Sequence, residues 1–92
     1  AIGYNAKATA GDTLALGTSS KASGSDALAI GKNANASNSD SIAIGQDTVS
    51  NNINSVALGK TSKATGASAT ALGPQAKATG LYGGGNWSQF RG

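Results

Sequence analysis

The sequence lacks the residues on which most catalytic and metal sites depend. None of its 92 residues is cysteine or histidine, and only four are acidic. Without cysteine there is no disulfide framework and no thiolate nucleophile, and without histidine the commonest general base is missing. The four acids stand alone or in turn-like stretches, and no serine or threonine has a plausible base beside it. We therefore expect a protein that is not an enzyme and that holds no metal or other cofactor.

Large apolar side chains are also scarce. The chain is 38% hydrophobic, but 18 of those residues are alanine. A domain of this length has a marginal core even when leucine and isoleucine are plentiful. No apolar run approaches the roughly 18 residues that a transmembrane helix needs, so we expect no direct membrane contact in this segment.

Charge is sparse and evenly spread. Charged residues make up 12% of the chain, and the seven Lys and Arg residues give a net charge of +3 without forming a basic block. A nucleic-acid-binding surface needs clustered cations. We therefore expect no nucleic-acid partner.

What the sequence does contain is a repeat of fourteen residues. Six glycines recur at this interval without a slip, each preceded by leucine or isoleucine and, before that, alanine. A fixed internal period is typical of solenoids, in which each unit stacks on its neighbour. The chain opens on "AIG", the end of such a unit, so we expect it to be a segment of a longer protein. The repeat glycines are Gly3, Gly17, Gly31, Gly45, Gly59 and Gly73.

Each repeat holds two short segments with the alternating pattern of a β-strand. One lies near the "LALG" stretch and the other near the "AKA" stretch that follows. Seven residues after each repeat glycine comes a residue such as Gly24 or Asn38, which we expect to turn a corner at positive φ. The many Ser, Thr and Asn residues disfavour helix, and successive heptads never carry large apolar residues at both a and d. The sequence thus predicts an all-β parallel β-roll, or solenoid, with fourteen-residue coils.

The alternation also suggests which side chains face inward. Because the leucines and isoleucines of the motif share one side of the strand, we assign them to the roll interior. A coil that buries only two large aliphatic side chains needs a further interface. The motif alanines are small enough for close approach of a partner chain; the alternative is packing within their own coil. The predicted interior is Leu14, Leu16, Leu28, Ile30, Ile42, Ile44, Val56, Leu58 and Leu72, and the predicted interface with partner chains is Ala15, Ala29, Ala43, Ala57 and Ala71.

A column of lysines is the nearest feature to a binding site. Lys7, Lys21, Lys63 and Lys77 each lie four residues after a repeat glycine. Stacked ammonium groups repel and must stay hydrated, so we expect the "AKA" strand to face solvent and the "LALG" strand to face the assembly axis. The column is either a solubilising, edge-protecting face or a positive stripe that binds an acidic polymer.

Two stretches depart from the pattern. In the fourth coil Val49 takes the lysine column and Ile53 a column of small residues, which indicates either drift of the repeat or a small exposed apolar contact patch. After Gly80 the motif stops, and three of the four aromatic residues follow. We interpret residues 1–80 as the roll and residues 81–92 as a cap or connector to a following domain; the alternative for the latter is a ligand-binding aromatic cluster.

The motifs "TLALG", "ALAIG", "SIAIG" and "SVALG", with "ATALG" as a weaker fifth, resemble the YadA-like head repeats of trimeric autotransporter adhesins. The resemblance covers residues 1 to about 80. It implies a left-handed β-roll that forms a homotrimer and projects from a Gram-negative outer membrane on a coiled-coil stalk. The stalk and the membrane anchor have no counterpart in this chain.

The function implied by the resemblance is adhesion. We expect a non-enzymatic head segment at the bacterial cell surface that binds a host extracellular-matrix protein, a cell-surface receptor or other cells, and so contributes to virulence. A different class of function is also compatible with the repeats, namely a structural spacer in a fibre or a segment of a phage tail fibre.

Overall fold

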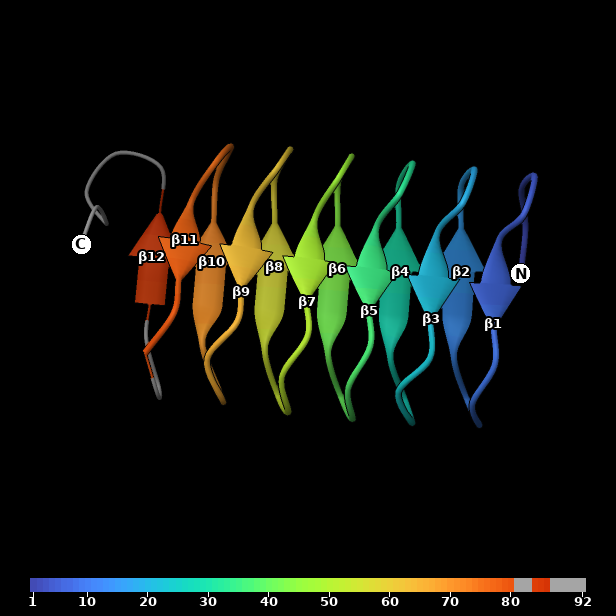
Figure 1. Ribbon diagram of the computed structural model, residues 1–92, viewed down its shortest axis with the longest axis horizontal. Helices are drawn as coiled ribbons and strands as arrows, with labels where there is room; N and C mark the ends of the chain where they lie inside the picture. The colour runs from blue at the N-terminus through green and yellow to red at the C-terminus, as the bar shows by residue number, and fades with distance from the viewer. Residues whose placement is uncertain (81–83, 87–92) are drawn as a thin grey trace.

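In the computed structural model, which describes residues 1–80 and 84–86, the chain is a parallel β-solenoid of about five turns (Figure 1). Every regular element in those residues is a short strand. The strands that carry the "AKA" stretches and their equivalents have two residues each: β1 (Lys7–Ala8), β3 (Lys21–Ala22), β5 (Asn35–Ala36), β7 (Val49–Ser50), β9 (Lys63–Ala64) and β11 (Lys77–Ala78). The others have three: β2 (Leu14–Leu16), β4 (Leu28–Ile30), β6 (Ile42–Ile44), β8 (Val56–Leu58), β10 (Thr70–Leu72) and β12 (Gly84–Asn86).

The strands form two six-stranded parallel sheets. Sheet A contains the even-numbered strands in the order β12-β10-β8-β6-β4-β2, and sheet B the odd-numbered strands in the order β1-β3-β5-β7-β9-β11. The pairing register is the repeat itself, with Ala29 opposite Ala43 and Lys7 opposite Lys21. The predicted coil of fourteen residues is therefore confirmed. The resulting slab measures 34 × 20 × 11 Å.

The hand of the coil can be followed in Figure 1. From the N-terminus the chain rises through a strand of sheet A at the back, crosses at the top and descends through a strand of sheet B at the front, while it advances to the left. This path is left-handed, which is the hand that the family resemblance implies.

Two kinds of turn join the sheets, and they share one geometry. After a sheet A strand, the Ala34 N–H donates to the Gly31 carbonyl at 3.1 Å, and Asn33 between them has φ 63°. After a sheet B strand, the Ser41 N–H donates to the Asn38 carbonyl at 3.2 Å, and Asp40 has φ 56°. A positive φ at the third of four residues is the feature of a type II turn. The two turns thus recur every seven residues with the same hydrogen bond and the same positive φ at the third residue, but only the repeat glycine adds a positive φ at the first.

The corner in the second turn lies where the sequence predicts it, but the left-handed residue was predicted wrongly. Positive φ occurs at Asp26 and Asp40 and not at Gly24 or Asn38, two residues earlier. Asp and Asn tolerate this region because their side chains bond the local backbone. Gly24 has another reason to be small: a Cβ there would collide with the backbone carbonyl of Asn38 in the next coil.

Glycine is required at the repeat positions both by the backbone conformation and by the short distance to the backbone of the next coil. Gly45 has φ 126°, and a Cβ built on it would lie 2.9 Å from the carbonyl carbon of Gly59. Side chains do not adopt this backbone conformation readily. The glycine column therefore lets successive coils stack at this corner.

The interior is filled by methyl and hydroxyl groups alone. The buried hydrophobic residues described are all alanines, and the buried polar residues are Ser and Thr, of which Thr48 is the largest. Ala36 of sheet B and Ala43 of sheet A are both completely buried, so the two sheets meet through small side chains. This explains the 11 Å thickness of the slab.

The sequence-based assignment of faces is therefore wrong for sheet A. The predicted partner-facing residues Ala15, Ala29, Ala43, Ala57 and Ala71 are fully buried within their own roll. The predicted interior residues lie on the outer face: Leu14, Leu16, Leu58 and Leu72 are exposed, and Leu28, Ile30, Ile42, Ile44 and Val56 are half-buried. The physical reason is volume, because a coil with two short strands leaves room for nothing larger than Thr between the sheets.

Sheet A continues beyond the last recognisable motif. β12 pairs with β10 in the repeat register, with Gly84 opposite Thr70. This pairing extends the solenoid backbone into the stretch that we interpret as a cap or connector. The three aromatic residues of that stretch lie outside the described residues.

Candidate functional site

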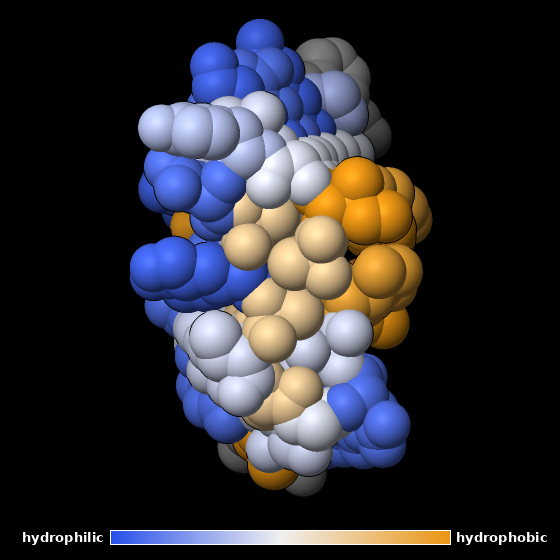
Figure 2. All heavy atoms as spheres, turned by 90° about the vertical axis from the view of Figure 1, so that its right-hand side faces the viewer, coloured by the Kyte–Doolittle hydropathy of each residue, from blue (hydrophilic) through white to orange (hydrophobic). Residues whose placement is uncertain are grey.

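The outer surface of sheet A is a continuous apolar strip, here called the aliphatic face. Its residues occupy two columns that flank the buried alanines, and parallel pairing stacks like upon like, with Leu28 opposite Ile42 and Ile30 opposite Ile44. Figure 2, a view along the solenoid axis from the N-terminal end, shows the hydrophobic side chains gathered on one side of the slab. The face comprises Leu14, Leu16, Leu28, Ile30, Ile42, Ile44, Val56, Leu58, Thr70 and Leu72.

The exposure of these side chains is high for aliphatic residues. Leu14 is 42% exposed and Leu72 47% exposed, whereas the alanines between the two columns are fully buried. Isolated surface leucines need no explanation, but a contiguous apolar strip that runs the length of a molecule marks an interaction surface. The described part of the chain thus carries its large apolar side chains on an outer face and only small ones in its interior.

The outer surface of sheet B is polar and positively charged, and is here called the lysine face. Lys7, Lys21, Lys63 and Lys77 are all exposed on it, as the sequence predicts. In Figure 2 this hydrophilic side lies opposite the aliphatic face. Strand pairing brings the predicted binding residues together as two pairs, Lys7 with Lys21 and Lys63 with Lys77.

The two lysine pairs are separated by an uncharged gap. Asn35 and Val49 fill the lysine column in the two central coils, and each pairs with its neighbours in the same register. Neighbouring parallel strands lie about 4.8 Å apart, so three steps place Lys21 about 14 Å from Lys63. The arrangement offers two separated positive positions to an extended ligand, with Val49 half-buried between them.

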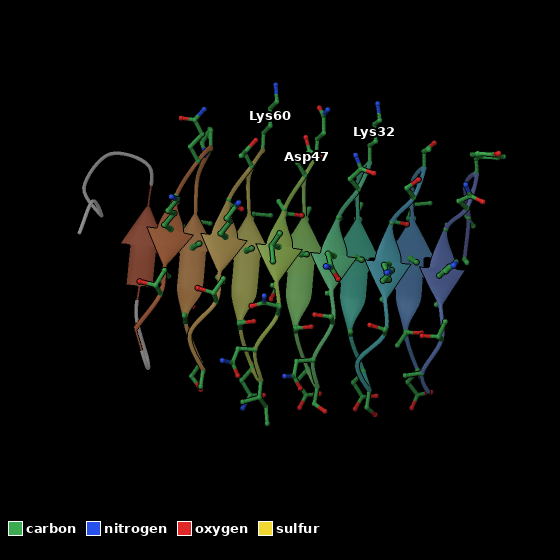
Figure 3. All side chains as sticks on the ribbon, viewed as in Figure 1. Lys32, Asp47 and Lys60 are labelled. Atoms are coloured by element: carbon green, nitrogen blue, oxygen red, sulfur yellow. The ribbon has the colours of Figure 1, made fainter. Side chains whose placement is uncertain are left out.

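In the described residues, one edge of the slab has a net positive charge and the other a net negative charge. Rim 1 consists of the turns that follow sheet A strands (residues 3–5, 17–19, 31–33, 45–47, 59–61 and 73–75), and it carries Lys32, Asp47 and Lys60 (Figure 3). Rim 2 consists of the turns that follow sheet B strands (residues 10–12, 24–26, 38–40, 52–54 and 66–68). Rim 2 carries the exposed acids Asp12, Asp26 and Asp40, and Ile53, which is 45% exposed.

Sequence reasoning placed these aspartates in turns but missed the separation of charge between rims. The signal was available in the repeat, because Lys32 and Lys60 lie one residue after a repeat glycine and the rim 2 aspartates nine residues after one. On rim 1 the carboxylate of Asp47 accepts a hydrogen bond from the coil before it, because Asn33 Nδ2 donates to Asp47 Oδ1 at 3.0 Å.

The abundant hydroxyl groups serve the turns. Thr48 Oγ1 donates to the Gly45 carbonyl at 2.9 Å, and Ser41 Oγ donates to the Asn38 carbonyl at 2.7 Å.

Within the described part of the chain, no three acidic side chains come together as metal ligands would. The same residues contain no helix long and apolar enough to cross a membrane.

A thin parallel solenoid with a small-residue interior and an apolar outer face defines a repetitive β-solenoid module. The YadA head domain repeat matches the chain six times in overlapping pairs of copies, over residues 1–20, 9–34, 22–48, 36–62, 50–76 and 64–83. These matches span nearly the whole sequence, and the chain belongs to the YadA head-repeat family. The family consists of adhesin-type segments of trimeric autotransporters. No curated protein matches the chain.

Proposed function

We propose that this chain is a non-enzymatic head segment of a trimeric autotransporter adhesin in which three copies pack their aliphatic faces around a common axis. The aliphatic face is the observation that carries the proposal. It is continuous, it has the length of the solenoid, and its side chains remain partly exposed in the single chain. Burying an aliphatic side chain fully gains about 1.5–3 kcal/mol, so covering the remaining exposed area of this many residues favours association.

The motif alanines of sheet A, which the sequence predicts at the interface, take no part in the interface proposed here. Its methyl groups pack against the opposite sheet of the same roll, so a partner cannot reach them. The sequence predicts the partner surface at Ala43. We assign it instead to Ile42 and Ile44, the residues on either side of Ala43 in the strand.

Packing of the aliphatic faces leaves the lysine faces outward, where they carry the adhesive role in this proposal. A trimer presents three such faces on parallel solenoids. Exposed lysines attract an acidic or extended host polymer, whether a matrix protein or a cell-surface receptor. Each contact is weak, and binding by several chains at once raises the overall affinity. The protein then acts at the bacterial cell surface, projecting from the outer membrane.

A spacer in a fibre, bacterial or phage, is the alternative function. The uniform register of the coils favours it, because a solenoid of identical steps separates two ends at constant width. Both functions need the aliphatic face, whereas only adhesion needs the lysine face. Substitutions on the two faces therefore distinguish them.

The test combines sedimentation with binding. We expect the wild-type chain to sediment as a trimer, and Ile44→Glu to sediment as a folded monomer because it places a carboxylate on the apolar interface. The matched control, Lys63→Glu, makes a charge change on the outer face and keeps the trimer. A variant with all four face lysines changed to Glu stays trimeric and loses binding on an array of matrix proteins and anionic glycans. A monomeric wild type overturns the trimer, and a trimer whose binding survives loss of the lysines overturns the adhesive role of that face.

A further inference from the structure

We propose that the two rims of neighbouring copies meet in the assembly, with Lys32 of one copy paired with Asp26 of the next. This inference rests on the proposed trimer and adds the contact that fixes how the copies are arranged around the axis. It starts from the opposite charges of the rims. Lys32 and Lys60 are exposed on rim 1, and Asp26 and Asp40 are exposed on rim 2.

Symmetry brings unlike rims together. In a ring of identical slabs that all turn the same face inward, rim 1 of each copy lies beside rim 2 of the next, because the contact is heterologous. In such a ring, rim 1 of one copy never lies beside rim 1 of another, and rim 2 never lies beside rim 2. Opposite charges on the two rims are therefore attractive at every junction, whereas like charges would repel at every junction.

The dimensions of the slab allow the rims and the aliphatic faces to touch at the same time. The slab is 20 Å from rim to rim. Three slabs of this width that meet at their edges form a triangle whose centre lies about 6 Å from each side. Packed sheets are about 10 Å apart, so the side chains of one face fill about 5 Å. Three aliphatic faces then reach the axis when the rims come into contact.

The turns that carry the two residues also match in height. In Figure 1 the turn between β3 and β4, residues 24–26, lies at about the same position along the long axis as the turn between β4 and β5, residues 31–33. Rotation about an axis parallel to the solenoid changes no heights. It therefore brings Lys32 of one copy level with Asp26 of the next.

The acid one coil further along, Asp40, is level with another acid of the adjoining rim, so this pair is repulsive unless neighbouring lysines offset it. By the same comparison, the turn that contains Asp40 is level with the turn that contains Asp47, which already accepts a hydrogen bond from Asn33. Lys32 and Lys60 lie one coil away on either side of Asp47, about 4.8 Å along the axis. A lysine side chain spans one such step, so Asp40 is flanked by cations of the adjoining rim. Among the described residues, Lys32 and Asp26 form the level pair of opposite charges, and they are the pair to test.

A double-mutant cycle tests the pairing, because within one chain the two residues occupy opposite rims of a slab 20 Å wide. Sites so far apart act additively unless they meet between chains. We expect Lys32→Glu and Asp26→Lys each to raise the trimer dissociation constant, measured by sedimentation, by about tenfold through repulsion at three junctions. The double variant Lys32→Glu/Asp26→Lys binds more tightly than either single variant, and the loss that remains reflects the cation that Lys32→Glu removes from beside Asp40. Lys63→Glu on the lysine face is the control for a charge change away from the rims and leaves assembly unchanged.

The outcomes separate this proposal from the one on which it depends. Additive effects of the two rim substitutions in a chain that still forms trimers overturn the rim pairing and leave the aliphatic interface standing. A wild-type chain that is monomeric overturns both. Circular dichroism of each variant shows whether the solenoid is retained, and the reciprocal pair Lys32→Gln and Asp26→Asn, which removes charge without reversing it, supplies a second cycle if a reversal variant fails to fold.

Discussion

Ala43 and Ile44 are consecutive residues of one strand, and their side chains lie on opposite surfaces of sheet A: Ala43 is fully buried in the roll, and Ile44 is on the outer face. The smaller residue thus belongs to the core of the chain, and the larger belongs to its exterior. This inverts the usual relation between apolar size and burial. It follows from the spacing of the two sheets, which the methyl groups of Ala43 and its neighbours set.

The first prediction concerns enlargement of the interior. Ala43→Leu inserts three carbon atoms where the opposite sheet leaves room for a methyl group, and we expect it to destabilise the roll by at least the roughly 1–3 kcal/mol typical of overpacking. Thermal unfolding followed by circular dichroism measures the effect. The matched control Ile44→Leu, on the outer face of the same strand, is expected to cost less than about 1.5 kcal/mol. Equal losses at the two positions would contradict the assignment of faces.

The second prediction concerns the glycine column. Gly45→Ala forces a side chain into a conformation at φ 126° and against the backbone of Gly59, and we expect a loss of about 1–3 kcal/mol or more in unfolding free energy. Gly11→Ala is the control, because no atom lies within 4 Å of a Cβ built there. Urea denaturation of the two variants provides the comparison. If Gly45→Ala is as stable as Gly11→Ala, the stacked glycines are not required.

The third prediction concerns a buried pair of hydroxyl groups. Ser50 Oγ and Ser55 Oγ are 2.6 Å apart, and Ser50 Oγ also lies 2.9 Å from the Ser55 carbonyl oxygen. Two other coils have alanine at both of these columns, one of them with Ala64 and Ala69. We expect Ser55→Ala alone to cost about 1 kcal/mol, because Ser50 Oγ loses one of its two partners. We expect Ser50→Ala/Ser55→Ala to be close to neutral, because the Asn52 and Ser55 carbonyl oxygens, which these hydroxyls also bond, keep their backbone donors. A double variant less stable than the single variant would show that the pair contributes net stability.

The fold follows from the sequence more fully than the faces do. The fourteen-residue spacing of the glycines predicts coil length, parallel pairing and register, and the lysine column predicts which side of sheet B is outside. Period-two alternation requires that Ala43 and Ile44 point in opposite directions, but it does not say which of them points inward. The general preference of large apolar residues for the interior suggests Ile44. The thickness of the roll reverses that choice, because Ala36 on the facing sheet leaves no space for a longer side chain.

A signal for the correct choice lies in the variability of the columns. The columns of Ala43 and Ala36 hold alanine in almost every coil, as a fixed sheet spacing requires, whereas the flanking columns change between leucine, isoleucine, valine and threonine or between lysine, asparagine and valine. The candidate interface was harder to foresee than the core. Lys32 and Asp26 are separated by six residues in sequence and by the width of the slab in space, and only the path of the coil shows that they are level.

The two seven-residue halves of each coil bear on how such a chain can change in length. A duplication or deletion of one whole coil adds or removes a step and leaves every downstream side chain on its original surface. A change of one half-coil would keep the seven-residue spacing of the turns, yet it would move the repeat glycines to the other rim and transfer the lysines to the side of the leucines from that point onward. Viable length variants of this protein are therefore expected to differ by complete repeats, so that the recombining unit in its gene is the pair of halves and never the half alone.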